Sequence, residues 1–302
     1  MRERTLEALG LGAAPREQPL TYPGAWPAGS GLLLGDTYLR LSPEPDTGLD
    51  RWPVEYGGPE SRVPLDEALA DAGAPPTGER TPVLAIGSNA CPGQLRYKMA
   101  ERGLSAVIPM VEVRVTGIEA GVSAHVSPLG YVSASPFHAP GRTRALFLTW
   151  LDGAQLEHVD RSEGVFLAQG AYDRIHLPAD RFPVEMPNGE LLNGVHAYAH
   201  RLGVLHDGTG APWVHPGERR LLTELIARSP LLREWFGGTP EEFSARALGD
   251  PELCERGTRL LRVEGLTLPS GLESLATAPG PSVGARRRGS PRLTPRPAAT
   301  AP

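Results

Sequence analysis

The sequence has 302 residues, of which 36 are glycine, 32 are proline and 40% are hydrophobic. Glycine and proline together average about 12% of a protein, so both are strongly enriched here, yet the hydrophobic content predicts that most of the chain folds. The net charge of −5 and a pI near 5.9 argue against nucleic acid as the main partner.

Cysteine usage and hydropathy bear on the compartment. Cys91 and Cys254 lie far apart and match neither a CxxC nor a zinc-binding spacing, which favours reduced thiols. No apolar run approaches the ~20 residues that span a bilayer, and the first twenty residues lack the apolar core of a secretory signal. We therefore expect a cytoplasmic protein with no membrane partner. Of its 30 basic residues only Lys98 is a lysine, which indicates a GC-rich genome.

Residues 1–80 are expected to form an irregular N-terminal extension. Their one strand-like stretch is LLLGDTYLRL, at 32–41, and a short helix is expected over 64–73, with Pro64 near its start and acids in its first turn. Residues 75–80, PPTGER, are typical of a linker.

Residues 81–202 are expected to form a compact domain. Helices are predicted over 93–103 and 152–164, and strands over 82–87, 106–120, 131–136, 144–151, 171–178 and 193–203. Residues 203–268 are expected to form a helical extension, with helices over 215–230 and 239–250, the second capped by Thr239. Residues 269–302, rich in arginine and proline, are expected to be a disordered tail.

The first segment with chemical potential is Gly87-Ser88-Asn89, which follows the apolar strand VLAI and precedes a helix. Such a turn points several backbone N–H groups at one spot, and the helix adds its positive end, so the segment suits a carboxylate or phosphate. The alternative is that Ser88 or Asn89 simply caps the helix.

The second is Glu163, in VDRSEG, at the end of the helix expected over 152–164. Acids are disfavoured there because the helix dipole presents negative charge. A glutamate placed against that preference, beside a glycine and an apolar Val-Phe, is a candidate for a carboxyl with raised pKa that works as general base and then acid. The alternative is a solvated surface glutamate.

Taken in order, four segments resemble one family. TPVLAIGSNACPGQL looks like the signature loop of the gamma-glutamyl cyclotransferases, and YVSASPFHAPGRTRALFLTWLDGAQLEHVDRSEGVF is similar to the family's strand, Pro-Gly turn, strand and helix ending in Leu-Asp-x-x-Glu-Gly. AYDRIHL is similar to its Tyr-x-Arg strand, and VHAYAHR to its last strand with a tyrosine. The resemblance covers residues 81–201.

This resemblance implies an α+β fold, a small mixed β-barrel flanked by helices, with a cavity between the glycine loop and the acid. It implies cyclisation of a small gamma-glutamyl compound to 5-oxoproline with release of an amine, and no metal or organic cofactor. Glu163 would be the catalytic acid/base. The substrate-binding residues would be Gly87, Ser88, Asn89 and Ala90 of the loop, together with Tyr198.

The sequence departs from the family pattern at Ile86, where the family usually has tyrosine, and mildly at Val159, where it has leucine. Asp160 is expected to be structural, with Arg161 or a backbone amide as partner. Two other functions stay open: a non-catalytic binding or scaffold module with the same fold, and a transferase acting on a carrier-bound gamma-glutamyl group.

Several polar side chains receive a structural interpretation. His196 and His200 would lie about 13 Å apart along a strand, too far to share a metal ion, and are expected to be partly buried. Tyr198, on the same face, is either a substrate hydrogen-bond donor or a core residue. Cys91, at a helix N-terminus, is either a reactive thiol or a small buried residue. The oligomeric state is left open.

Overall fold

A computed structural model describes residues 4–57 and 61–276. Ten strands form one mixed sheet in the order β4-β3-β2-β1-β6-β7-β5-β10-β8, with β9 paired to β6. Neighbours are antiparallel except β5 and β10, which run parallel. The strands are β1 (Gly31–Leu34), β2 (Thr37–Leu41), β3 (Pro53–Glu55), β4 (Arg62–Pro64), β5 (Thr81–Ala85), β6 (Val107–Val122), β7 (Ala134–Leu151), β8 (Tyr172–Leu177), β9 (Val184–Glu185) and β10 (Val195–His200). The β11 (Val204–Leu205) and β12 (Thr267–Leu268) strands pair separately.

The barrel expected from the family resemblance is wrong for the described residues, because their sheet is open. Its path runs from β4 at one end to β8 at the other, and these two strands do not pair. The physical reason is that β1 pairs with β6 and carries β2, β3 and β4 outward, so the N-terminal strands extend the sheet. The chain is therefore a mixed α+β fold built on a large open sheet.

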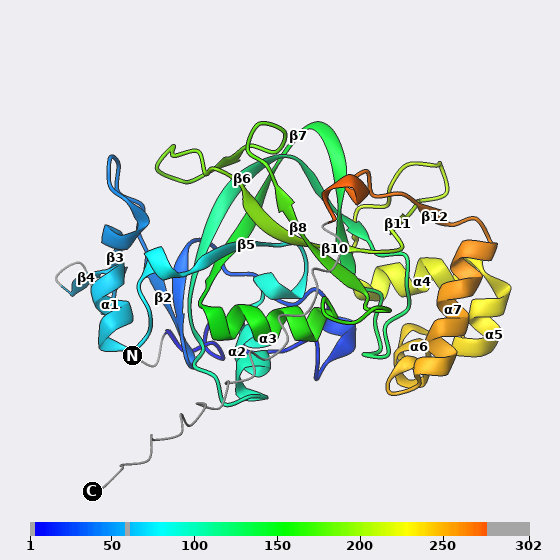
Figure 1. The fold of residues 1–302 in the computed structure, drawn as a ribbon. Coiled ribbons are helices and arrows are strands. Elements are labelled where there is room, and N and C mark those ends of the chain that lie inside the picture. The colour runs from blue at the N-terminus through cyan, green and yellow to red at the C-terminus, as the bar shows by residue number, and fades with distance from the viewer. Residues whose placement is uncertain (1–3, 58–60, 277–302) are drawn as a thin grey trace, which may run out of the picture.

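The long hairpin of β6 and β7 is the centre of this sheet (Figure 1). The two strands expected over 131–136 and 144–151 are parts of the single strand β7. The intervening Pro-Gly turn does not interrupt it, because the register shifts beside Gly117, which pairs with Ala139, while Thr116 pairs with Thr143. The extra residues thus form a bulge, and Gly117, at φ +86°, adopts a conformation that favours glycine.

Seven helices are described: α1 (Leu65–Asp71), α2 (Pro92–Ala100), α3 (Gly153–Glu163), α4 (Glu218–Arg228), α5 (Pro230–Phe236), α6 (Pro240–Ala247) and α7 (Pro251–Val263). Figure 1 shows α4 to α7 together at one end of the molecule and α1 with β3 and β4 at the other. Helices α5 and α7 were not predicted from the sequence. The predicted cap at Thr239 is confirmed, since its side chain accepts from the Glu242 N–H. Most of the arginine-rich tail, 277–302, lies outside the described residues.

Three apolar clusters hold these layers together. One includes Trp52 and Phe182 on one side of the sheet; the second joins the sheet to α2 and α3 and includes Leu95 and Val159. The third packs α4 to α7 against Val122–Val132, the connection between β6 and β7. This third cluster places the C-terminal helices behind a segment that lines the candidate site.

Candidate functional site

A cavity of about 380 Å³ lies where the glycine loop, the end of α3 and the β6–β7 connection meet. Among the residues singled out from the sequence, Gly87, Ser88, Asn89, Glu163 and Tyr198 line it. Ala90 does not, because its side chain is fully buried beneath the loop. Five of the six expected site residues, from three separate stretches of the sequence, thus meet at one cavity.

The glycine loop follows the C-terminal end of β5 and lines the cavity. Ser88–Ala90 form one turn of 3-10 helix, in which the Ala90 N–H donates to Gly87 O and the Cys91 N–H to Ser88 O. Within the described residues, the N–H groups of Ser88 and Asn89 meet no acceptor. The amide group of Ala90 is therefore occupied, and the backbone donors that the loop offers are those of residues 88 and 89.

Glu163 is the last residue of α3, which begins at the N-cap Asp152 and ends at Gly164 in the left-handed conformation. Its Oε1 accepts from the Lys98 Nζ at 2.8 Å and from the Asn89 Nδ2 at 3.2 Å. The Lys98 ammonium also donates to the Asn89 Oδ1 at 2.9 Å. The Glu163 side chain is 16% exposed, so the alternative of a solvated surface glutamate is not what the structure shows.

Asp160, one turn before Glu163, is the anchor of this end of α3. Its Oδ1 accepts from the Tyr198 hydroxyl at 2.8 Å, and its Oδ2 lies 3.0 Å from the Arg174 guanidinium. Its expected partner, Arg161, instead pairs with Glu157 on the exposed face. Burial raises the pKa of Asp160, and the hydrogen bond from Tyr198 and the charge of Arg174 oppose that shift.

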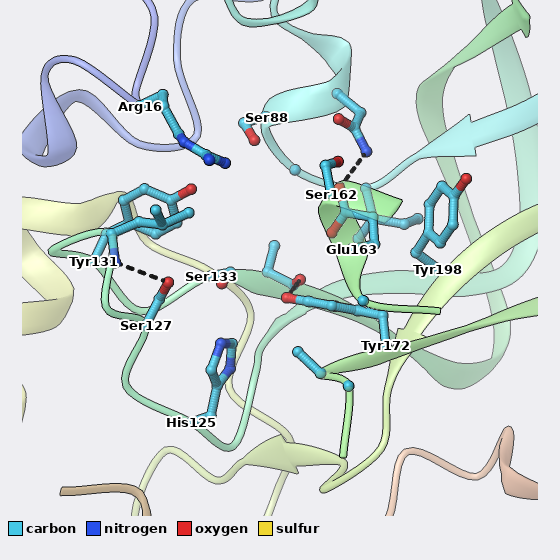
Figure 2. A pocket seen from close by; sticks show the side chains of 18 of the residues that line it. Arg16, Ser88, His125, Ser127, Tyr131, Ser133, Ser162, Glu163, Tyr172 and Tyr198 are labelled. Atoms are coloured by element: carbon cyan, nitrogen blue, oxygen red, sulfur yellow. Dashed lines mark hydrogen bonds between the residues drawn. The ribbon is translucent and has the colours of Figure 1, made fainter. Parts of the chain in front are cut away.

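Tyr198 directs its hydroxyl away from the other labelled residues of Figure 2, toward Asp160. Its ring belongs to the apolar cluster between the sheet and the helices. The hydroxyl hydrogen is thus already donated, and of the two interpretations of Tyr198 the geometry favours the core residue.

The wall opposite Glu163 carries hydrogen-bond donors from the N-terminal segment. Arg16 extends toward the cavity beside Tyr131 and Ser88 (Figure 2), and its guanidinium has one ion pair, 3.7 Å from Glu101. The Tyr22 hydroxyl accepts from the Ala134 N–H at 2.7 Å and approaches Gly87 so closely that a Cβ there would lie 2.2 Å from it. This wall is positively charged and rich in donors, which suits an anionic group.

His125 lines the far side of the cavity, and its ring stacks on that of His200 behind it. Their rings stack at 4.1 Å, and burial lowers the pKa of His125 to about 4 and that of His200 well below its ordinary value. His196 lies instead beside His176, with ring centroids 5.4 Å apart. Among the described residues, no three histidine, cysteine or acidic side chains are grouped to hold a metal ion.

Two further observations concern reactivity and membranes. Cys91 is buried, and that burial raises the pKa of its thiol, as expected of the small buried residue rather than the reactive thiol. Within 4–57 and 61–276, no helix has the length and apolar character needed to cross a bilayer.

Sequence reasoning missed four cavity residues with distinct chemistry: Arg16, Tyr22, Lys98 and Tyr131. Lys98 had a signal, since it is the one lysine in the sequence and lies on the helix that follows the loop. No sequence signal pointed to Arg16 or Tyr22, because they lie more than sixty residues before the loop, in a segment outside the family resemblance. Only the packing of the N-terminal segment brings them to the cavity.

Comparison with known proteins gives distant structural likeness only. No family model and no curated protein matches the chain. A solved gamma-glutamyl cyclotransferase is 15% identical, over 60% of this chain and 99% of its own, with a TM-score of 0.32. YkqA from Bacillus subtilis is 14% identical over 70% of this chain and 63% of its own, with a TM-score of 0.31, and an uncharacterized protein from Homo sapiens is 18% identical over 40% and 67%, with a TM-score of 0.30.

Proposed function

We propose that this protein is a gamma-glutamyl cyclotransferase-like enzyme that cyclises a small gamma-glutamyl amine or amide to 5-oxoproline and releases an amine. Glu163 is the general base and then the general acid. The backbone N–H groups of Ser88 and Asn89, together with the hydrogen-bond donors of the opposite wall, hold the substrate's carboxylate. No metal or organic cofactor takes part in this scheme.

One observation carries the proposal: Glu163 and the glycine loop, 74 residues apart, are joined by the hydrogen bond from Asn89 at the edge of one cavity. The cavity of about 380 Å³ is at the small end of ligand pockets, which suits a substrate of amino-acid or dipeptide size. Arg16 lies on one wall, and the Glu163 carboxylate, paired with Lys98, lies on the other. The carboxylate of an amino acid suits the Arg16 wall, and its ammonium suits the Glu163 oxygen that accepts no hydrogen bond.

The chemistry follows from this arrangement. Glu163 takes a proton from the substrate's α-ammonium, and the free amine attacks the γ-carbonyl carbon to form the new C–N bond of a five-membered ring. Glu163 then gives the proton to the leaving nitrogen as its C–N bond breaks, and the ring nitrogen loses its second hydrogen as a proton to the released amine. Acid–base help contributes about 10²–10⁴-fold, so holding the amine against the carbonyl supplies much of the remaining acceleration.

The alternative of a non-catalytic module predicts a solvent-facing Glu163 or a loop cavity filled by the N-terminal segment. Instead, Arg16 and Tyr22 of that segment line the cavity without filling it, and Glu163 is mostly buried. These observations favour the enzyme over the binding module.

The test is release of 5-oxoproline from a panel of gamma-glutamyl amines and gamma-glutamyl amino acids. Glu163→Gln is expected to lower kcat by about 10²–10⁴-fold, since the amide cannot take up the proton. Glu157→Gln, on the exposed face of the same helix, is the matched control and is expected to keep wild-type activity. Cyclisation that survives Glu163→Gln would show that another group does the proton transfer.

A further inference from the structure

We propose that Lys98 is a positioning residue for Glu163: with Asn89 it occupies Oε1 of the carboxylate, which leaves Oε2 to take the substrate's proton. This inference rests on the proposed function, but its physical core, the coupling of Lys98 to Glu163, can be measured without turnover.

The three side chains form a closed ring of three hydrogen bonds. Lys98 donates to both partners, and Asn89 accepts through Oδ1 and donates through Nδ2. Only this orientation of the amide is compatible with both neighbours, because the reverse would set its NH₂ group against the ammonium and its oxygen against the carboxylate. The Asn89 side chain therefore holds Glu163 through one of its two Nδ2 hydrogens.

The two oxygens of Glu163 consequently differ. Oε1 accepts two hydrogen bonds, whereas Oε2 accepts none from the described part of the chain. A carboxylate fixed through one oxygen presents the other in a single direction, and such fixed placement is what proton transfer to a bound amine requires.

The pair is also shielded from water. Lys98 is 4% exposed, on a helix whose other buried residues include Leu95 and Met99. A charge buried to this extent needs a partner, and an ion pair broken by loss of one member leaves the other uncompensated. Lys98 and Glu163 are thus each other's counter-charge.

Other titratable and charged groups surround Glu163. From the elements packed around it these are Arg16, Tyr22, His125, Tyr131, His158, Asp160, Arg161, Tyr172 and Tyr198. Burial raises the pKa of the four tyrosines and lowers that of His125 to about 4, so these five stay neutral near pH 7. Glu163→Gln removes the Glu163 carboxyl and leaves these other groups in place, so comparison with the wild type isolates the Glu163 step.

The first test uses the fact that the chain has one lysine. Protein grown on lysine labelled with ¹⁵N at Nζ gives one side-chain signal. We expect that signal to shift as Glu163 takes up its proton on acidification, and that step to be missing in Glu163→Gln. An Nζ signal with the same pH dependence in both proteins would overturn the proposal.

The second test is the pH profile of kcat/KM. Because a nearby cation favours the ionised carboxyl, Lys98→Met is expected to move the acidic limb to higher pH, with activity recovering as the pH rises. Lys98→Arg should keep the limb near its wild-type position, and Arg102→Met, an exposed charge just beyond α2, should change nothing. An equal loss at every pH, or an unmoved limb, would mean a merely structural lysine.

The outcomes separate the two proposals. A wild-type chain whose Nζ signal follows Glu163 but which releases no 5-oxoproline from any gamma-glutamyl compound refutes the proposed function and leaves the coupling established. A chain that cyclises these compounds with an Nζ signal indifferent to Glu163→Gln refutes the role of Lys98 alone.

Discussion

The variant Tyr198→Phe tests whether the Tyr198 hydroxyl binds the substrate or anchors Asp160 of α3. The change removes one hydroxyl, whose hydrogen the Asp160 carboxylate accepts at 2.8 Å, and leaves the ring in its apolar cluster. A hydrogen bond to a charged group contributes about 1.5–3 kcal/mol. Asp160 keeps its ion pair with Arg174, so the loss is expected at the lower end of that range. At roughly 2–4 °C per kcal/mol for a large domain, the midpoint of thermal unfolding should fall by several degrees.

The assay is urea unfolding of wild type, Tyr198→Phe, Asp160→Asn and the double variant, with KM measured on each. We expect the two single changes to be non-additive in the free energy of unfolding, since both act on the same bond: Tyr198→Phe removes its donor, and Asp160→Asn replaces its charged acceptor with a neutral one. KM should change less than twofold in Tyr198→Phe. A tenfold rise in KM with unchanged stability would refute the reasoning and make Tyr198 a substrate donor.

Two further predictions address the wall opposite Glu163 and its support. Arg16→Gln is expected to raise KM about 10-fold with kcat nearly unchanged, since a charged hydrogen bond to the substrate is lost. The control, Arg102→Gln, should leave KM unchanged. Equal KM values in the two variants would contradict binding of the substrate's carboxylate at Arg16. Glu218 is buried on α4, its Oε1 accepts from the Val132 N–H at 2.8 Å, and burial raises its pKa well above 4.5. Folding then holds a proton that the unfolded chain loses, so stability falls as pH rises above about 4.5 toward the folded pKa. Glu218→Gln should remove that fall in urea unfolding at pH 5 and 7, and parallel pH dependence of the two proteins would contradict it.

The sequence indicated the local elements near the site well. Apolar alternation and capping residues placed β5, α2, α3 and β10 within a few residues of their observed bounds, because these signals depend on neighbours along the chain. Strand pairing did not follow from the same signals. The open sheet arises because β1 pairs with β6, a contact between residues about 75 positions apart, and no local pattern encodes it.

The same distinction applies to the site. The glycine and proline that enrich this sequence mark its turns. The resemblance of four ordered segments to one family nominated Gly87, Ser88, Asn89 and Glu163. Ala90, which was expected beside them, does not line the cavity, and its N–H group donates within the turn.

Tertiary structure alone decided what surrounds Glu163. In the sequence, Lys98 indicated only the composition of the genome. In the structure, α2 places its Nζ 2.8 Å from the Glu163 Oε1. Arg16 and Tyr22 reach the cavity because the N-terminal segment packs beside the loop, against Gly87 and Gln94. Charges and hydrogen-bond donors act over a few ångströms in space, whatever their separation in the chain. The helices and strands near the site could therefore be predicted from the sequence, and the electrostatics of the cavity could not.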